Sequence, residues 1–188
     1  MSIVDRTSDA HGLHRATLAL AHDARLDPIV DRIADALPDA LESGPVRDAL
    51  GGRWLGHALH PLMTDLPLGT WMSASLLDVL PGRNTDGAAE KLLTFGLLAA
   101  LPTVAAGWSD WTHATRDERR VGVAHAAVNG SAAALYLGSL IARKAKRHRL
   151  GVTLGIAGGL VAIVGGYLGG HLASAMDTAL RNTADVTS

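Results

Sequence analysis

The sequence contains no cysteine. Disulfides, thiolate metal sites, cysteine-ligated iron–sulfur clusters and a cysteine nucleophile are therefore excluded within this chain. Any metal must be held by nitrogen or oxygen ligands, which nine histidines and the carboxylates can supply. An excess of one charge is also lacking, because 17 basic residues are balanced by 18 acidic ones. The chain thus has no basic surface of the kind that binds nucleic acid.

Charge is sparse, with 19% charged residues against 48% apolar residues. Residues 1–53 are polar and carry no signal-peptide pattern, whereas long runs beyond them are uncharged apart from single histidines. Runs of about 18–25 such residues match the hydrocarbon thickness of a bilayer. We therefore predict an all-α fold, a four-helix transmembrane bundle with an N-terminal amphipathic helical extension. The expected parts are an extension (1–53), a bundle (54–175, with spans at about 59–80, 91–110, 121–142 and 150–173) and a tail (176–188).

The N-terminal extension contains the segment LDPIVDRIADALPDAL, in which apolar residues recur at helical spacing. This pattern predicts an amphipathic helix that is broken near Pro38 and lies on the membrane surface or against the bundle. His11, His14 and His22 precede the helix in a polar stretch, where we expect them to be solvated.

A dense cationic tract, RKAKRHR at residues 143–149, joins the third and fourth expected spans. The positive-inside rule places this Arg143–Arg149 loop in the cytoplasm. Both termini and the loop SDWTHATRDERR then lie on the other side. The expected location is a cytoplasmic membrane that the chain crosses several times.

Histidines are expected to converge at one membrane face, because antiparallel spans alternate in direction. The five are His57, His60, His113, His125 and His171. Only His148, in the cationic tract, is expected at the opposite face. This clustering predicts a cofactor or metal site between the helices.

Other polar residues near these histidines are candidates for the same site. Asp65 lies deeper in the first span, where an ionisable group is a functional candidate. Pro67 frees the carbonyl of Met63 close by. Asn129 follows His125 by four residues, so it shares a helix face and could orient the ring or a ligand.

Small residues mark the last two spans. Gly151, Gly155 and Gly159 are four residues apart, and Gly166 and Gly170 repeat the spacing. Such stripes allow helix backbones to approach closely in lipid. We expect tight packing here, and a homo-oligomer through glycine-rich faces is a further possibility.

The chain resembles the DUF2231 family of four-span bacterial membrane proteins. The resemblance is carried by GHALHPLMTDLPLGTW, GWSDW, HAAVN and GGYLGGHL, and it covers about residues 53–175. It implies the four-span fold and a bacterial membrane. Some relatives continue into a Rieske 2Fe–2S domain, whose cluster needs cysteines that this chain lacks. The resemblance therefore implies a redox neighbourhood, with a Rieske-type or other redox protein as partner.

Four hypotheses for function follow from these residues. The first is a b-type cytochrome, in which two of His60, His125, His171 and His57 hold haem b and electrons pass to or from a partner. The second is a non-haem zinc, copper or iron site built from the same histidines with Asp65 or His113. The third is a cofactor-free membrane anchor subunit of a redox complex. The fourth is a transporter or proton path that uses Asp65 and the histidines.

Motifs of common enzyme classes do not occur. The sequence has no serine–histidine–acid set, no phosphate loop and no dinucleotide fingerprint. Whether the protein is an enzyme is therefore left open by the sequence.

Overall fold

Four long helices form the body of the protein in the computed structural model, which describes residues 12–80 and 86–174. They are α4 (Leu59–Val79), α5 (Asp86–Thr112), α6 (Arg116–Lys144) and α7 (His148–Ser174). The described residues contain no strand, so the predicted all-α fold is confirmed. The expected tail, residues 176–188, lies outside the described residues.

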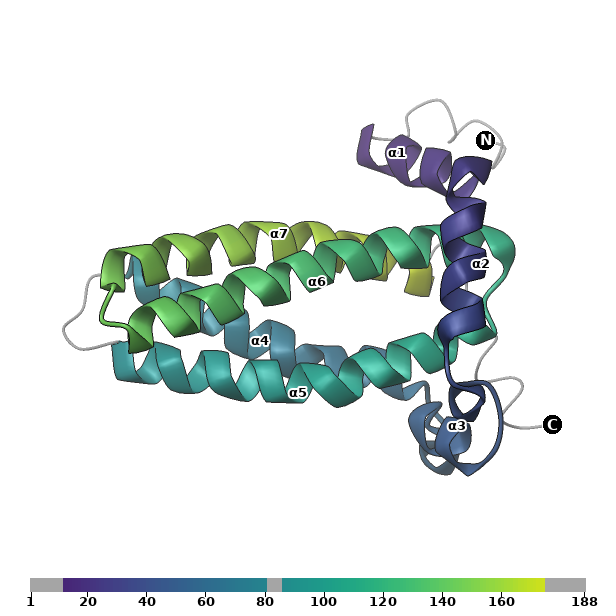
Figure 1. The fold of residues 1–188 in the computed structure, drawn as a ribbon, viewed down its shortest axis with the longest axis horizontal. Coiled ribbons are helices and arrows are strands. Elements are labelled where there is room, and N and C mark those ends of the chain that lie inside the picture. Colours follow the sequence, from purple (N-terminus) through teal and green to yellow (C-terminus); the bar gives the residue numbers. More distant parts are fainter. Residues whose placement is uncertain (1–11, 81–85, 175–188) are drawn as a thin grey trace, which may run out of the picture.

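The long helices pair as two hairpins that run side by side (Figure 1). The most extensive contacts lie within each hairpin, between α4 and α5 and between α6 and α7. Smaller contacts, of α4 with α7 and of α5 with α6, join the two hairpins. Helices α4 and α6 therefore lie on a diagonal of the bundle and face each other across its axis.

Shorter helices form an N-terminal arm that crosses one end of the bundle (Figure 1). The arm comprises α1 (Gly12–Ala21), η2 (Ala24–Leu26), α2 (Asp27–Ala36), η3 (Asp39–Leu41), α3 (Pro45–Leu50) and η4 (Arg53–Leu55). The predicted amphipathic helix is confirmed as α2, which ends before Pro38 because a proline disfavours helical geometry in the preceding residue. We call this end of the bundle the arm end.

Local sequence explains how the long helices begin and bend. Thr115 and Glu118 form a capping box at the start of α6, in which each side chain bonds the other residue's backbone N–H. Pro67 lies inside α4 and leaves the Met63 carbonyl without its helical donor. The Thr103 hydroxyl of α5 lies 3.4 Å from that carbonyl oxygen, so the neighbouring helix compensates for the proline.

Two arginines of α6 hold the arm against the bundle. Arg120 donates two hydrogen bonds to the Asp27 carboxylate, at 2.7 and 3.0 Å, and a third to the Ala21 carbonyl at 2.8 Å. Arg116 donates to both Asp31 oxygens, at 2.5 and 3.1 Å. Charge-assisted bonds of this kind are the stronger class of protein hydrogen bonds. They fix the arm across the bundle end.

Acid is expected to loosen the arm. The hydrogen bond from Arg120 holds the pKa of Asp27 below its usual value of 3.8, and Arg116 does the same for Asp31. A lowered folded pKa stabilises the attachment fully above pH ~4 and loses this effect as the pH falls through the folded value. Hydrogen exchange of residues 12–36, corrected for the intrinsic rate, should therefore be faster at about pH 3 than at about pH 7.

Substitution should reproduce this loosening at neutral pH. Arg120→Gln is expected to raise exchange in the arm about tenfold, because it removes the charge-assisted hydrogen bonds to Asp27. Arg32→Gln is the matched control, since Arg32 is exposed on α2. Equal protection of the arm in both variants and at both pH values would show that the ion pairs do not attach it.

Candidate functional site

Two histidine rings face each other between the helices, on the bundle axis near the arm end. His60 comes from the first turn of α4 and His125 from the third turn of α6, the two helices that face each other diagonally. Their ring centroids are 6.4 Å apart and their planes are nearly perpendicular, at 87°. The structure thus brings together two of the histidines that the sequence predicted as ligands.

Each ring is held by a backbone carbonyl of the other helix in its own hairpin. His60 Nδ1 lies 2.9 Å from the Thr103 oxygen on α5, and His125 Nδ1 lies 3.1 Å from the Gly165 oxygen on α7. A carbonyl oxygen only accepts, so Nδ1 must carry the proton in both rings. In the neutral imidazole, Nε2 then keeps its lone pair, which is the form that binds a metal.

Glycines make the space that these rings occupy. A Cβ added at Gly107 would lie 2.7 Å from His60 Cε1, and one at Gly169 would lie 2.8 Å from His125 Cε1. Gly165 serves Asn129 in the same way, at 2.5 Å from its Oδ1. Asn129 donates to the His125 carbonyl at 2.9 Å and packs beside the ring, as predicted from its spacing. The His60 ring is therefore confined by the backbone of α5, and the His125 ring by that of α7.

The two hairpins hold their histidines in the same manner. In each hairpin, the first helix carries the histidine and the second helix carries a carbonyl that accepts from its ring. A glycine four residues after that carbonyl lies against the same ring, as Thr103 and Gly107 do for His60. In the other hairpin, Gly165 and Gly169 meet His125. The site therefore consists of two matching halves, related across the bundle axis.

The same relation continues along α4 and α6. His60 and His125, Trp71 and Tyr136, and Asp78 and Arg143 form three facing pairs, each separated by 65 residues. The Trp71 and Tyr136 rings stack at 5.0 Å and 27°. Within each helix the three positions are 11 and 7 residues apart, spacings that return to one helix face. One face of α4 thus meets the equivalent face of α6 along most of their length.

The third pair is a buried ion pair that sequence reasoning missed. Arg143 Nη2 lies 2.6 and 2.5 Å from the two Asp78 oxygens, and the side chains are 1% and 3% exposed. Arg143 was expected in the cationic loop, but it belongs to the last turn of α6 and points inward. The signal that could have revealed it is the 65-residue offset shared with the histidines.

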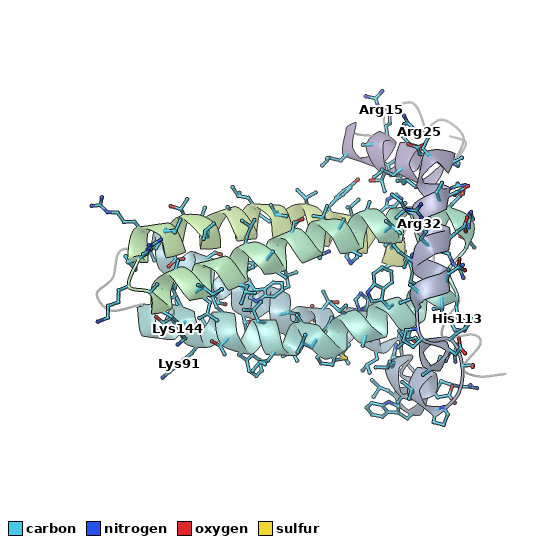
Figure 2. All side chains as sticks on the ribbon, viewed as in Figure 1. Arg15, Arg25, Arg32, Lys91, His113 and Lys144 are labelled. Atoms are coloured by element: carbon cyan, nitrogen blue, oxygen red, sulfur yellow. The ribbon has the colours of Figure 1, made fainter. Side chains whose placement is uncertain are left out.

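The other predicted ligands lie away from this pair. His57 is exposed just after η4, and Asp65 is exposed on α4. His113 is exposed at the arm end, where its ring contacts Ser109 and Thr112 of its own helix (Figure 2). Within residues 12–80 and 86–174, no group of three or more histidines and carboxylates is close enough to hold a metal ion.

His171 faces the arm instead of the central pair. Its ring lies 5.3 Å from that of His14 on α1, and the residue is 7% exposed. Its Nε2 is buried and has no hydrogen-bond partner among the described residues. The expectation that His14 is solvated is therefore wrong, because α1 packs against α6 and the His14 ring lies against His171 of α7. His11 lies outside the described residues.

The glycine stripe of α7 packs inside the chain, as expected. An added Cβ at Gly151, Gly155 or Gly159 would lie against Arg143, Asp78 or Ser75 respectively. Gly166 and Gly170 differ, since an added Cβ at either has nothing within 4 Å. Most of the stripe therefore serves the bundle's own core.

The central pair could supply two nitrogen ligands to one cofactor. The Nδ1 atoms of both rings are bonded to the Thr103 and Gly165 carbonyls, so the Nε2 atoms are the candidate ligands. Asn129 Nδ2 lies 3.4 Å from His125 Nε2 and would have to leave it for a ligand bond to form. Imidazole nitrogen is a donor that haem iron accepts.

A helical bundle that exposes many large apolar side chains is typical of a membrane protein. The chain matches the family described as "Predicted membrane protein (DUF2231)" over residues 56–181, which is more than half of its length, and it belongs to this family. No curated protein matches the chain, and no solved structure matches it. The resemblance predicted from the sequence is confirmed, and most of the arm lies before the matched region.

Proposed function

We propose that this protein is an integral membrane carrier of electrons that binds haem b between His60 and His125. The observation that carries the proposal is the pair of facing rings, 6.4 Å apart, whose Nδ1 atoms are both bonded to helix carbonyls. When bound, haem b supplies reversible one-electron transfer. The chain's own residues hold the two imidazoles in register, fix their tautomers and confine them between helices. Nothing in this role requires a substrate pocket.

The proposal includes four membrane spans, α4 to α7. Two helices, Gly87–Thr112 and His148–Ala173, are long and apolar enough to cross a membrane, and only 28% and 33% of their most apolar windows are buried. A core helix of a soluble protein would be mostly buried. All four helices also expose large apolar side chains, including Leu66, Leu98, Ile141 and Ile163. Lipid around the whole bundle accounts for this exposure.

The proposed orientation places the end opposite the arm in the bacterial cytoplasm. Lys91 and Lys144 lie at that end, away from His113 (Figure 2). Lys146, Arg147 and Arg149 are exposed there as well. This cluster of cations supports the orientation through the positive-inside rule. The arm and the central histidines then lie toward the outer face.

The proposal includes two kinds of partner, a redox protein and a second copy of the chain. A Rieske-type or other redox protein would exchange electrons with the histidine pair from the nearer, arm-side face. A second copy of the chain would have to use a glycine face that the bundle itself leaves open. Gly166 on α7 is such a position, since nothing lies within 4 Å of an added Cβ.

The histidine pair favours haem over the non-haem alternative. A stable non-haem site usually needs three or more protein ligands, and the described residues gather only two histidines at the bundle centre. The hypothesis of a cofactor-free anchor predicts a colourless protein, so an absorption spectrum distinguishes it from the haem hypothesis. Transport through Asp65 is not favoured, because Asp65 is exposed and apart from the central histidines.

The test is an absorption spectrum of the purified protein, oxidised and then reduced with dithionite, with metal analysis on the same sample. We expect a Soret band that sharpens on reduction and resolved α and β bands, as six-coordinate haem gives. A colourless protein with stoichiometric zinc or copper would move the assignment to a non-haem site. A colourless, metal-free protein after expression with added haem would overturn both and leave the anchor.

Single substitutions should then assign the ligands. His60→Ala and His125→Ala are each expected to abolish the spectrum of six-coordinate haem, because each removes one of the two imidazoles that would hold the group. His148→Ala, at the opposite end of the bundle, and His113→Ala, on the arm-end surface, should leave the spectrum unchanged. Full haem content and an unchanged spectrum in His125→Ala would exclude the central pair as ligands.

A further inference from the structure

A cavity of about 200 Å³ lies where the arm meets the bundle. One wall is the segment from the end of α2 through η3, and the other is formed by Trp111 and Thr112 at the end of α5 with Arg119 in the first turn of α6. We call it the arm cavity, and its polar lining includes Asp35, Asp39, Glu42, Thr112 and Arg119. This volume is below that of the sites that hold drug-sized ligands and suits a small polar group.

The charges of the arm cavity are divided between its walls. Asp35, Asp39 and Glu42 come from the arm, whereas Arg119 comes from the bundle. Within the described part of the chain, Arg119 forms no ion pair with a carboxylate, although neighbouring Arg116 and Arg120 do. Opposite charges that share a cavity without meeting are available to a ligand that carries both signs.

Arg119 is held in place without a counter-ion. Its guanidinium lies 5.1 Å from the centroid of the Trp111 ring, a cation–π distance, and it donates to the Thr112 carbonyl. Trp111 in turn donates from its indole N–H to the Arg119 carbonyl at 3.0 Å. The Arg119 Nε is buried and has no hydrogen-bond partner in the residues that the structure describes. A guanidinium positioned in this way is suited to an anion such as phosphate.

The charges of the arm cavity match those of a zwitterionic group. Arg119 lies in the first turn of α6, and the three carboxylates lie on the arm. A phosphoethanolamine group carries an anionic phosphate and a cationic ammonium a few bonds apart. We propose that the arm cavity binds a phosphoethanolamine group, with phosphate at Arg119 and ammonium among Asp35, Asp39 and Glu42. This site does not depend on haem at the central histidines.

The test is native mass spectrometry of the full chain in detergent, titrated with phosphatidylethanolamine and, separately, with phosphatidylglycerol of the same acyl chains. The wild type should retain phosphatidylethanolamine in preference. The triple variant Asp35→Asn, Asp39→Asn, Glu42→Gln should lose about tenfold in this binding, and so should Arg119→Gln. Arg32→Gln, an exposed cation on the same arm outside the cavity, is the control. Asp35, Asp39 and Glu42 are exposed, so the triple variant should fold normally. It therefore decides the test if Arg119→Gln lowers the stability of the protein.

A second experiment identifies the source of the phosphoethanolamine group. Soluble glycerophosphoethanolamine that displaces the lipid and binds with the same variant dependence assigns a soluble ligand of this chemistry. Binding seen only with the lipid assigns a membrane headgroup. Equal retention of both lipids, or undiminished binding of phosphatidylethanolamine by the triple variant, overturns the proposal.

Discussion

Replacing Asp78 by alanine is expected to lower the free energy of unfolding by about 3–5 kcal/mol, because it leaves the Arg143 charge buried without its main counter-ion. The two side chains are 1% and 3% exposed, so water cannot replace the lost carboxylate without opening the bundle. Arg143 Nε also contacts the Ser139 hydroxyl at 3.3 Å, and that hydroxyl donates to the Gly151 carbonyl at 2.6 Å. Loss of Asp78 therefore disturbs α4, α6 and α7 together.

A surface ion pair between neighbouring helices provides the control. Lys144 and Glu90 are 3.2 Å apart with side chains 64% and 28% exposed, so Glu90→Ala should cost less than about 1 kcal/mol. The double variant Asp78→Leu, Arg143→Met should recover most of the loss, because it removes both buried charges. Unfolding in mixed detergent, followed by circular dichroism, measures all three. Similar small losses for Asp78→Ala and Glu90→Ala would show that burial adds nothing to the inner pair.

Replacing Gly169 by valine is expected to remove the proposed binding of haem at His125 while the bundle stays folded. An added Cβ would already lie 2.8 Å from His125 Cε1, and the two further methyl groups of valine would push the ring from its place against the Gly165 carbonyl. Loss of an outer-shell partner typically costs 10–100-fold in metal affinity, and a displaced ligand costs at least as much. We expect the apparent affinity for haem to fall about 100-fold.

The matched control lies three residues earlier on the same helix. Gly166→Val adds the same side chain where nothing lies within 4 Å of a Cβ, so haem affinity should be unchanged. Gly107→Val should reproduce the effect on the other half of the site, since its Cβ would lie 2.7 Å from His60 Cε1. Haem titration monitored at the Soret band, with helicity measured on each sample, separates loss of the site from unfolding. Equal titration of Gly169→Val and Gly166→Val would show that His125 is not a ligand.

Helix positions could be predicted well from the sequence. A mostly apolar run interrupted by Asp65 predicted a span at 59–80, and an uncharged run with one histidine predicted a span at 150–173; the structure has α4 at Leu59–Val79 and α7 at His148–Ser174. The other two helices extend a few residues beyond their expected ends, because charged residues such as Arg116 and Lys144 continue the helix past the apolar run. Among the described residues, only α5 and α7 are both long and apolar enough for a span, so the composition of α4 and α6 does not by itself establish that they cross the membrane.

Pairing within the site could be predicted only in part. Sequence placed His60, His125 and His171 at one end of the bundle, because antiparallel helices alternate in direction. It did not state which of them face the axis, since an apolar helix in a membrane shows no clear polar face from which to read its rotation. The structure pairs His60 with His125 and turns His171 toward His14 on the arm.

What the sequence by itself determined is the class of the protein: all helical, without thiol chemistry, with its histidines gathered toward one end and its family readable from short motifs. The tertiary structure decided which side chains meet. Backbone carbonyls of Thr103 and Gly165 fix the two rings, and diagonal packing of α4 on α6 buries Asp78 against Arg143. The reason is physical, because composition and periodicity set where a helix begins and ends, whereas the contacts across a bundle depend on helix rotation, which only packing determines.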